Sequence, residues 1–175
     1  METFRFMELC ADLGIKLVNL SAGSPYYNPH LQRPAAYPPS DGYSPPHDPL
    51  IDVARQINAV RKIRAKAASS LILVGSAYSY LQEYLPHVAQ AVVRQGWADV
   101  VGIGRAVLSY PEVLSDAMRK GAMNPRLICR TFSDCTTAPR NGLPSGCYPL
   151  DKFYTATPAF QKLKEIKKNM GGQNV

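Results

Sequence analysis

Two glycines and a cation stand together in Gly102-Ile103-Gly104-Arg105, a combination that can bind an anion. Gly102 lies near the end of an apolar run, residues 97–103, and Gly104 and Arg105 follow it directly. The apolar run predicts a buried strand. A glycine lets a ligand approach the main chain because no Cβ stands in the way. Amides between a strand end and a helix start bind phosphate, and arginine adds a bidentate contact. We therefore predict a phosphate site at Gly102, Gly104 and Arg105.

A second glycine stop, Gly75-Ser76, follows the apolar run 71–74, which also predicts a buried strand. In (β/α) barrels, phosphates commonly bind to the loops after the last two strands. Gly75 and Ser76 would then form the other half of the same site. A dinucleotide-binding glycine pattern is not completed, because Val107 stands three residues after Gly104. The alternative interpretation is that these glycines only permit tight turns between strand and helix.

No other group of residues indicates catalysis or metal binding. The histidines are His30, His47 and His87, and their spacing suits neither a metal nor a catalytic triad. The unevenly spaced cysteines are Cys10, Cys129, Cys135 and Cys147. Their spacing is not that of a secreted disulfide framework, and no Cys-x-x-Cys pair is present. We therefore predict no metal site.

The apolar patterns predict an α/β fold in which helices and strands alternate. Strands are expected at 16–21, 71–74 and 97–103, and helices at 3–13, 48–67, 86–95, 111–118 and 157–169. Asp48-Pro49 is a strong helix start, with Asp as the cap and Pro at the first position. Short apolar strands that end in glycine or serine are typical of a parallel sheet covered by helices. The proline-rich residues 22–49 and residues 122–156 are expected to be irregular.

The composition favours a globular protein with one ordinary core. The chain has 175 residues, 46% of them hydrophobic, and a formal net charge of +7. The basic residues are scattered and mostly suit solvated helix faces, so nucleic-acid binding is not predicted. No apolar run reaches the roughly 20 residues that span a bilayer, and the amino end has no signal pattern. We expect a cytoplasmic protein with no membrane contact.

Four segments resemble the NADH:flavin oxidoreductases, the old yellow enzyme family. They are LVNLSAGSPYY (17–27), LILVGSAYSYLQEYLP (71–86), WADVVGIGRAVLSYPEV (97–113) and ICRTFSDCTTAPRNGLPSGCYPLD (128–151). The resemblance extends over nearly the whole chain. It implies a TIM (β/α)8 barrel that binds FMN and passes hydride from NADH or NADPH to flavin and then to a small-molecule substrate.

The resemblance also assigns residues. Gly75, Ser76, Gly104 and Arg105 would bind the FMN phosphate, with Gly102 allowing close packing. The loop with Ser24, Tyr26 and Tyr27 would lie on the substrate side of the flavin. In the dienoyl-CoA-reductase-like branch this tail holds an iron–sulfur cluster. Cys135 and Cys147 keep the eleven-residue separation of that branch, but Cys129 is out of register and a fourth ligand is absent, which implies a cluster-free member.

The length implies an incomplete barrel. The matching region resembles the last three of eight strands, so we expect a partial flavin-binding barrel in residues 1–150 and a tail helix in 151–175. Such a part would expose strand edges and an apolar face, where the missing barrel half or a self-association partner binds. Catalytic residues are not assigned. The alternatives are a stand-alone module that binds a phosphate ligand without redox chemistry, and a basic interaction protein.

Overall fold

The computed structural model describes residues 2–24, 26–39 and 42–171, which form two compact units. The first, here the sheet unit, comprises Met1–Pro34 and Asp48–Gly104. The second, here the tail unit, comprises Ala35–His47 and Arg105–Val175. The expected tail helix region therefore includes four residues, 172–175, that lie outside the described part.

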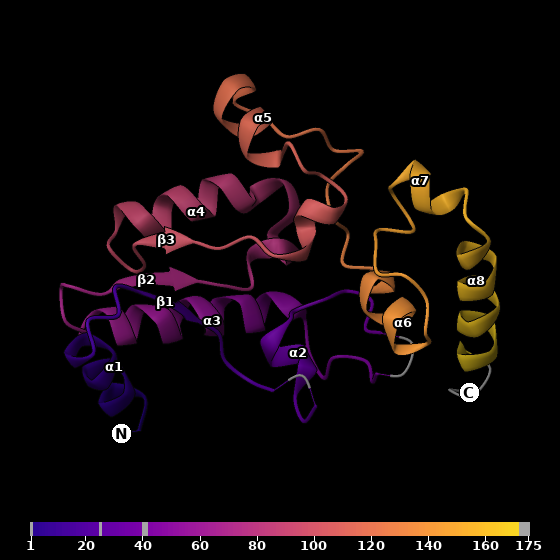
Figure 1. Cartoon of the computed structure of the whole chain (residues 1–175). Coiled ribbons are helices and arrows are strands. Elements are labelled where there is room, and N and C mark those ends of the chain that lie inside the picture. Colours follow the sequence, from indigo (N-terminus) through magenta and orange to yellow (C-terminus); the bar gives the residue numbers. More distant parts are fainter. Residues whose placement is uncertain (1, 25, 40–41, 172–175) are drawn as a thin grey trace. The chain divides into compact units, whose positions relative to one another are not determined.

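The sheet unit contains a three-stranded parallel sheet, so the predicted α/β class is confirmed (Figure 1). Its strands are β1 (Leu17–Leu20), β2 (Ile72–Gly75) and β3 (Val100–Val101), in the order β1-β2-β3. Leu17 pairs with Ile72, and Val74 pairs with Val100. All three strands lie within the predicted runs, or one residue beyond. β3 is much shorter than its apolar run because it pairs with β2 over two residues only.

Helices join these strands. They are α1 (Glu2–Asp12), α2 (Pro29–Gln32), α3 (Pro49–Arg64), the 3₁₀ segment η1 (Tyr78–Tyr84) and α4 (Leu85–Arg94). The predicted start of α3 is confirmed, since the Asp48 carboxylate accepts a hydrogen bond from the Leu50 amide at 2.8 Å. The expectation that residues 22–49 are irregular is wrong at one place, Pro29–Gln32. The one-turn α2 begins at Pro29, whose ring suits a first helical position.

One face of the sheet is covered and the other is exposed. Right-handed crossovers between successive, adjacent parallel strands put α3 and α4 on the same face. The burial pattern agrees: Leu73 is fully buried, whereas its neighbour Ile72 is 42% exposed. Leu17 and Val100, which share the open face with Ile72, are also about half exposed. The sheet is therefore wound in one direction and open on one side.

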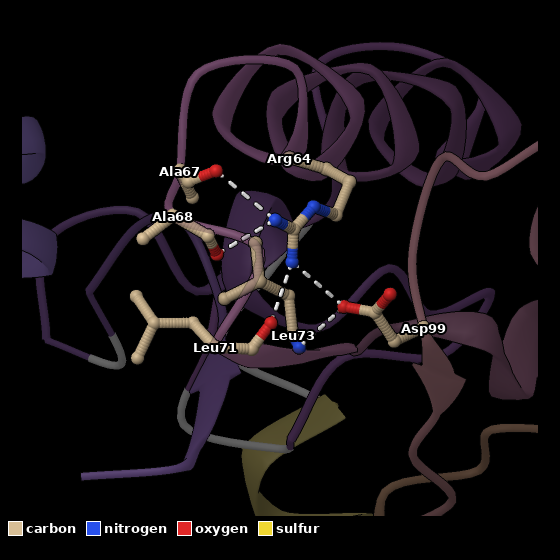
Figure 2. Close-up of polar contacts among 6 residues, drawn as sticks. All are labelled: Arg64, Ala67, Ala68, Leu71, Leu73 and Asp99. Carbon is tan, nitrogen blue, oxygen red and sulfur yellow. Dashed lines mark hydrogen bonds and ion pairs between the residues drawn. The ribbon is translucent and has the colours of Figure 1, made fainter. Parts of the chain in front are cut away.

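Arg64, in the last turn of α3, ties together the amino ends of β2 and β3 (Figure 2). Its guanidinium donates to the carbonyls of Ala67, Ala68 and Leu71 at 3.0, 2.8 and 2.6 Å. It also pairs with the Asp99 carboxylate at 2.9 Å, which in turn accepts the Leu73 amide at 2.8 Å. This network lies at the end of the strands opposite the glycine loops.

The tail unit has its own helices and its own small core. Its elements are η2 (Arg105–Leu108), α5 (Val113–Lys120), α6 (Asp134–Arg140), α7 (Lys152–Thr155) and α8 (Pro158–Gly171). Ala138, Tyr148 and Leu163 are almost completely buried together. The prediction that residues 122–156 are irregular is wrong for α6 and α7. Among the described residues, no helix is both long and apolar enough to cross a bilayer.

Candidate phosphate site

The carboxyl ends of the three strands bring together the glycine loops that the sequence singles out. The Gly102 amide donates to the Gly75 carbonyl at 2.8 Å, so both glycine stops lie at one edge of the sheet. The Ser76 hydroxyl donates to Oδ1 of Asn19 at 2.7 Å, linking the end of β2 to β1. Loops at the carboxyl edge of parallel strands are the usual ligand-binding positions in α/β proteins.

The glycines differ in what a side chain would meet. A Cβ on Gly75 would lie 3.0 Å from the Tyr78 hydroxyl, and one on Gly102 would lie 3.0 Å from Cγ1 of Val74. Packing within the sheet unit therefore explains both glycines. A Cβ on Gly104 would meet nothing within 4 Å among the described residues. Gly104 is exposed and has space for a ligand to approach its backbone.

The loop after β2 holds strained backbone. Ala77 has φ of +74° and Gln82 has φ of +51°, values that are unfavourable for residues with a Cβ. Tyr78, between them, is buried, and burial raises its pKa to about 12. Its hydroxyl has no hydrogen-bond partner among the described residues. Such strain concentrates at binding sites, so this loop is a second sign of function beside Gly75 and Ser76.

Arg105 directly follows Gly104 in the chain. Gly104 is the last residue of the sheet unit, and Arg105 belongs to the tail unit. Its side chain is exposed and donates to the Thr136 hydroxyl on α6. Within the sheet unit, the structure thus assembles four of the five residues predicted for the phosphate, namely Gly75, Ser76, Gly102 and Gly104.

The predicted substrate-side loop is a tight turn. The Ser24 hydroxyl accepts the Tyr26 amide at 3.2 Å, and the Asn28 amide donates to the Ser24 carbonyl at 3.1 Å. Tyr26 and Tyr27 are 86% and 87% exposed. Two adjacent aromatic side chains are therefore presented to solvent, and their predicted contact with substrate stays a prediction.

Asn19 is a site residue that the sequence reasoning missed. It stands in β1, in register with Val74, and its side-chain amide reaches Ser76. The signal was present, because Asn19 is the polar residue within the apolar run Leu17–Leu20. Beyond the acceptor used by Ser76, the amide carries two donors that suit an anionic or carbonyl ligand.

The cysteines of the tail unit influence one another. Burial is the main cause that raises the pKa of the Cys147 thiol, and the nearby Cys129 and Cys135 raise it further. The amides of Leu150 and Asp151 oppose this shift by hydrogen bonding. That Cys129, Cys135 and Cys147 hold no metal stays a prediction.

No protein-family model, curated protein or solved structure matches this chain. The resemblance of its four segments to the NADH:flavin oxidoreductases thus rests on those residues alone.

Proposed function

We propose that this chain provides the FMN-phosphate site of a (β/α)-barrel oxidoreductase of the NADH:flavin type. The observation that carries the proposal is that Gly75, Ser76 and Gly102 lie together at the carboxyl ends of β2 and β3. The chain continues from there to Gly104, where a ligand has space to approach the backbone. A phosphate accepts hydrogen bonds from main-chain amides, and it needs close approach to them. The unfilled space at Gly104 fits this requirement, since a Cβ would narrow it.

The parallel order of the strands, and the position of the helices on one face, support a barrel. Three parallel strands follow one another in order and carry helices on one face only. Parallel sheets normally have both faces covered. In a barrel the open face, with Leu17, Ile72 and Val100, points inward and packs against the remaining strands. The missing strands would come from another part of the protein or from a partner that completes the barrel.

The roles of the residues follow from their chemistry. Backbone amides of the Gly75-Ser76 and Gly102–Gly104 loops would bind the phosphate oxygens, and the Arg105 guanidinium would neutralise their charge. Asn19, held by Ser76 at 2.7 Å, would orient a polar group of the ligand on the open face. Bound FMN would supply the redox chemistry by accepting hydride from NADH or NADPH and passing it to a small-molecule substrate.

Binding measurements on three variants test the site. Arg105→Ala is expected to weaken FMN binding by about 1.5–3 kcal/mol, the scale of a hydrogen bond to a charged group. Gly104→Val is expected to weaken FMN binding without lowering the thermal midpoint, because a Cβ at this position would meet nothing within 4 Å among the described residues. Lys62→Ala, which removes an exposed charge from α3, is the matched control and should leave the affinity unchanged.

Fluorescence titration with FMN, riboflavin and a colourless sugar phosphate separates the proposal from its main alternative. FMN binding that riboflavin fails to reproduce supports a phosphate-anchored flavin site. Equal binding of FMN and the sugar phosphate favours the stand-alone phosphate module, since the same backbone amides suit either ligand. An affinity for FMN that neither Arg105→Ala nor Gly104→Val changes would remove both residues from the site.

A further inference from the structure

The free edge of β3 borders an open groove. The groove has a volume of about 520 Å³ and is lined by Ala89, Gln90, Val93 and Arg94 of α4 and by Asp99, Val100 and Val101 at β3. Val93 and Val100 are 43% and 44% exposed, which leaves apolar surface in contact with water. β3 is an outer strand, so the backbone groups of its far edge pair with no strand among the described residues. An exposed apolar surface and an unpaired strand edge are both typical of a site where another chain binds.

The sheet unit repeats one arrangement, in which a helix precedes each strand. The pairs are α1–β1, α3–β2 and α4–β3, and the strands are parallel and in sequence order. A further pair added in the same sense would lay its strand along β3 and its helix in the groove beside α4. The occupant that this geometry requires is therefore a helix followed by a parallel strand.

The α1–β1 pair of the chain itself has the necessary surface. Met7 and Cys10 bury one stripe of α1 within the sheet unit. Phe6 and Leu9 of α1, with Leu13 directly after its last residue, form a neighbouring stripe that is more than half exposed. Their spacing of three and four residues puts them on one helix face. β1 is the other outer strand, so its far edge is also unpaired with a strand in the described sheet.

Charge favours a second copy as the occupant. Helix α1 is acidic, although the chain has a net charge of +7. It contains three carboxylates and one guanidinium, namely Glu2, Glu8, Asp12 and Arg5. The groove presents the basic Arg94, and α4 contains no acidic residue. The acidic residue in the lining, Asp99, is neutralised by its ion pair with Arg64 at 2.9 Å. An acidic, apolar helix beside a basic, apolar groove is electrostatically complementary.

We propose that this chain self-associates head to tail, with α1–β1 of one copy docked on the α4–β3 edge and groove of the next. The two surfaces are different, so the interface is heterologous, and a dimer retains one free surface of each kind to which further copies can add. None of the phosphate-site residues takes part in this association. It uses the β1 and β3 edges that the remaining strands of a barrel would otherwise pair with, so it is proposed for this chain on its own.

A mixing experiment tests this arrangement. Leu9→Glu places a charge on the α1 stripe, and Val93→Glu places one in the groove. Each variant alone should lose association by at least about tenfold, because the interface must bury an unpaired carboxylate. An equal mixture should form a heterodimer and nothing larger, since Leu9→Glu retains an intact groove and Val93→Glu retains an intact α1. Light scattering after size-exclusion chromatography measures the masses.

The wild-type chain should form oligomers that grow with concentration. Met118→Glu, on an 85% exposed position of α5, is the control and should associate like the wild type. Circular dichroism should show all variants folded, because both test positions are already about half exposed. A monomeric wild type, or variants that associate normally, overturns the proposal. A mixture that stays monomeric also overturns it, because a heterologous interface must be restored by mixing.

Discussion

The buried hydroxyl of Tyr78 opposes folding. Its oxygen has no hydrogen-bond partner among the described residues, and a buried polar group in that position costs about 1–3 kcal/mol. Tyr78→Phe removes this penalty and leaves the ring packed beneath Gly75. We expect the free energy of unfolding at pH 7 to rise by about 1 kcal/mol, measured by urea denaturation.

Tyr148→Phe is the matched control for this change. Tyr148 is fully buried, but its hydroxyl donates to the Pro144 carbonyl at 2.7 Å. Removing it should lower the free energy of unfolding by about 1 kcal/mol, because an acceptor loses its partner. The two variants should thus shift stability in opposite directions, and a loss of stability in both would refute the assignment of Tyr78 as unpaired.

The Tyr78 pKa also predicts an alkaline loss of stability. Burial holds this phenol neutral until about pH 12 in the folded chain, whereas the unfolded chain releases the proton near the ordinary value of 10.0. Between these values the unfolded state binds fewer protons, so stability falls as pH rises. The loss amounts to about 2–3 kcal/mol from this group and should be missing in Tyr78→Phe.

At the scale of elements, Arg64 is expected to be a main stabilising contact of the sheet unit. Its side chain is largely buried and joins the end of α3 to the amino ends of β2 and β3. Arg64→Ala should lower the free energy of unfolding by about 2–3 kcal/mol, because the carbonyls and Asp99 lose a charged donor. Urea denaturation checks this value.

Two further variants identify the cause. Arg64→Lys keeps the charge but lacks the planar group that reaches several acceptors at once, so it should recover only part of the loss. Arg61→Ala, which removes an exposed guanidinium lying 5.0 Å from the Trp97 ring centroid, should cost less than about 1 kcal/mol. Full recovery with lysine would mean that charge alone stabilises this corner.

Local patterns predicted most elements because their causes are local. Asp48-Pro49 begins α3, and Gly14, Gly96 and Gly121 have the positive φ values that end helices. α6 escaped prediction for a tertiary reason. It follows Ser133, whose φ of +65° accompanies a hydrogen bond from its hydroxyl to the Tyr37 carbonyl, 96 residues away in the sequence.

The candidate site was predictable to a similar extent. The glycines stood out because their residue type already carries the relevant property, the absence of a Cβ. The Asn19–Ser76 hydrogen bond joins residues 57 positions apart. It depends on the register between β1 and β2, which hydrophobic patterning does not determine to the residue.

At the scale of the whole molecule, an early segment of the chain belongs to the later unit. Residues 35–47 interrupt the sheet unit in sequence and pack with the tail unit instead. The Ala36 amide donates to the Thr131 hydroxyl at 2.9 Å, and the Tyr37 ring stacks on Phe132 at 5.4 Å. The described residues of this segment, 35–39 and 42–47, therefore belong to the tail unit.

The stacking of Tyr37 on Phe132 should protect this loop from proteolysis. Phe132→Ala removes a ring from the contact and is expected to speed chymotryptic cleavage after Tyr43 several-fold, because local opening of residues 35–47 then costs less. Cleavage after Tyr27, which lies in the sheet unit and is already exposed, is the internal reference and should not change.

Phe153→Ala is the control for loss of an aromatic ring in the tail unit. Phe153 is 70% exposed on α7, so its removal should leave the rate at Tyr43 near that of the wild type. Mass spectrometry of timed digests gives both rates. Equal acceleration at Tyr43 and Tyr27 in Phe132→Ala would indicate global unfolding. Unchanged rates at both would mean that Phe132 does not hold the loop, and that the hydrogen bonds from Ala36 and Ser133 are sufficient to order residues 35–47.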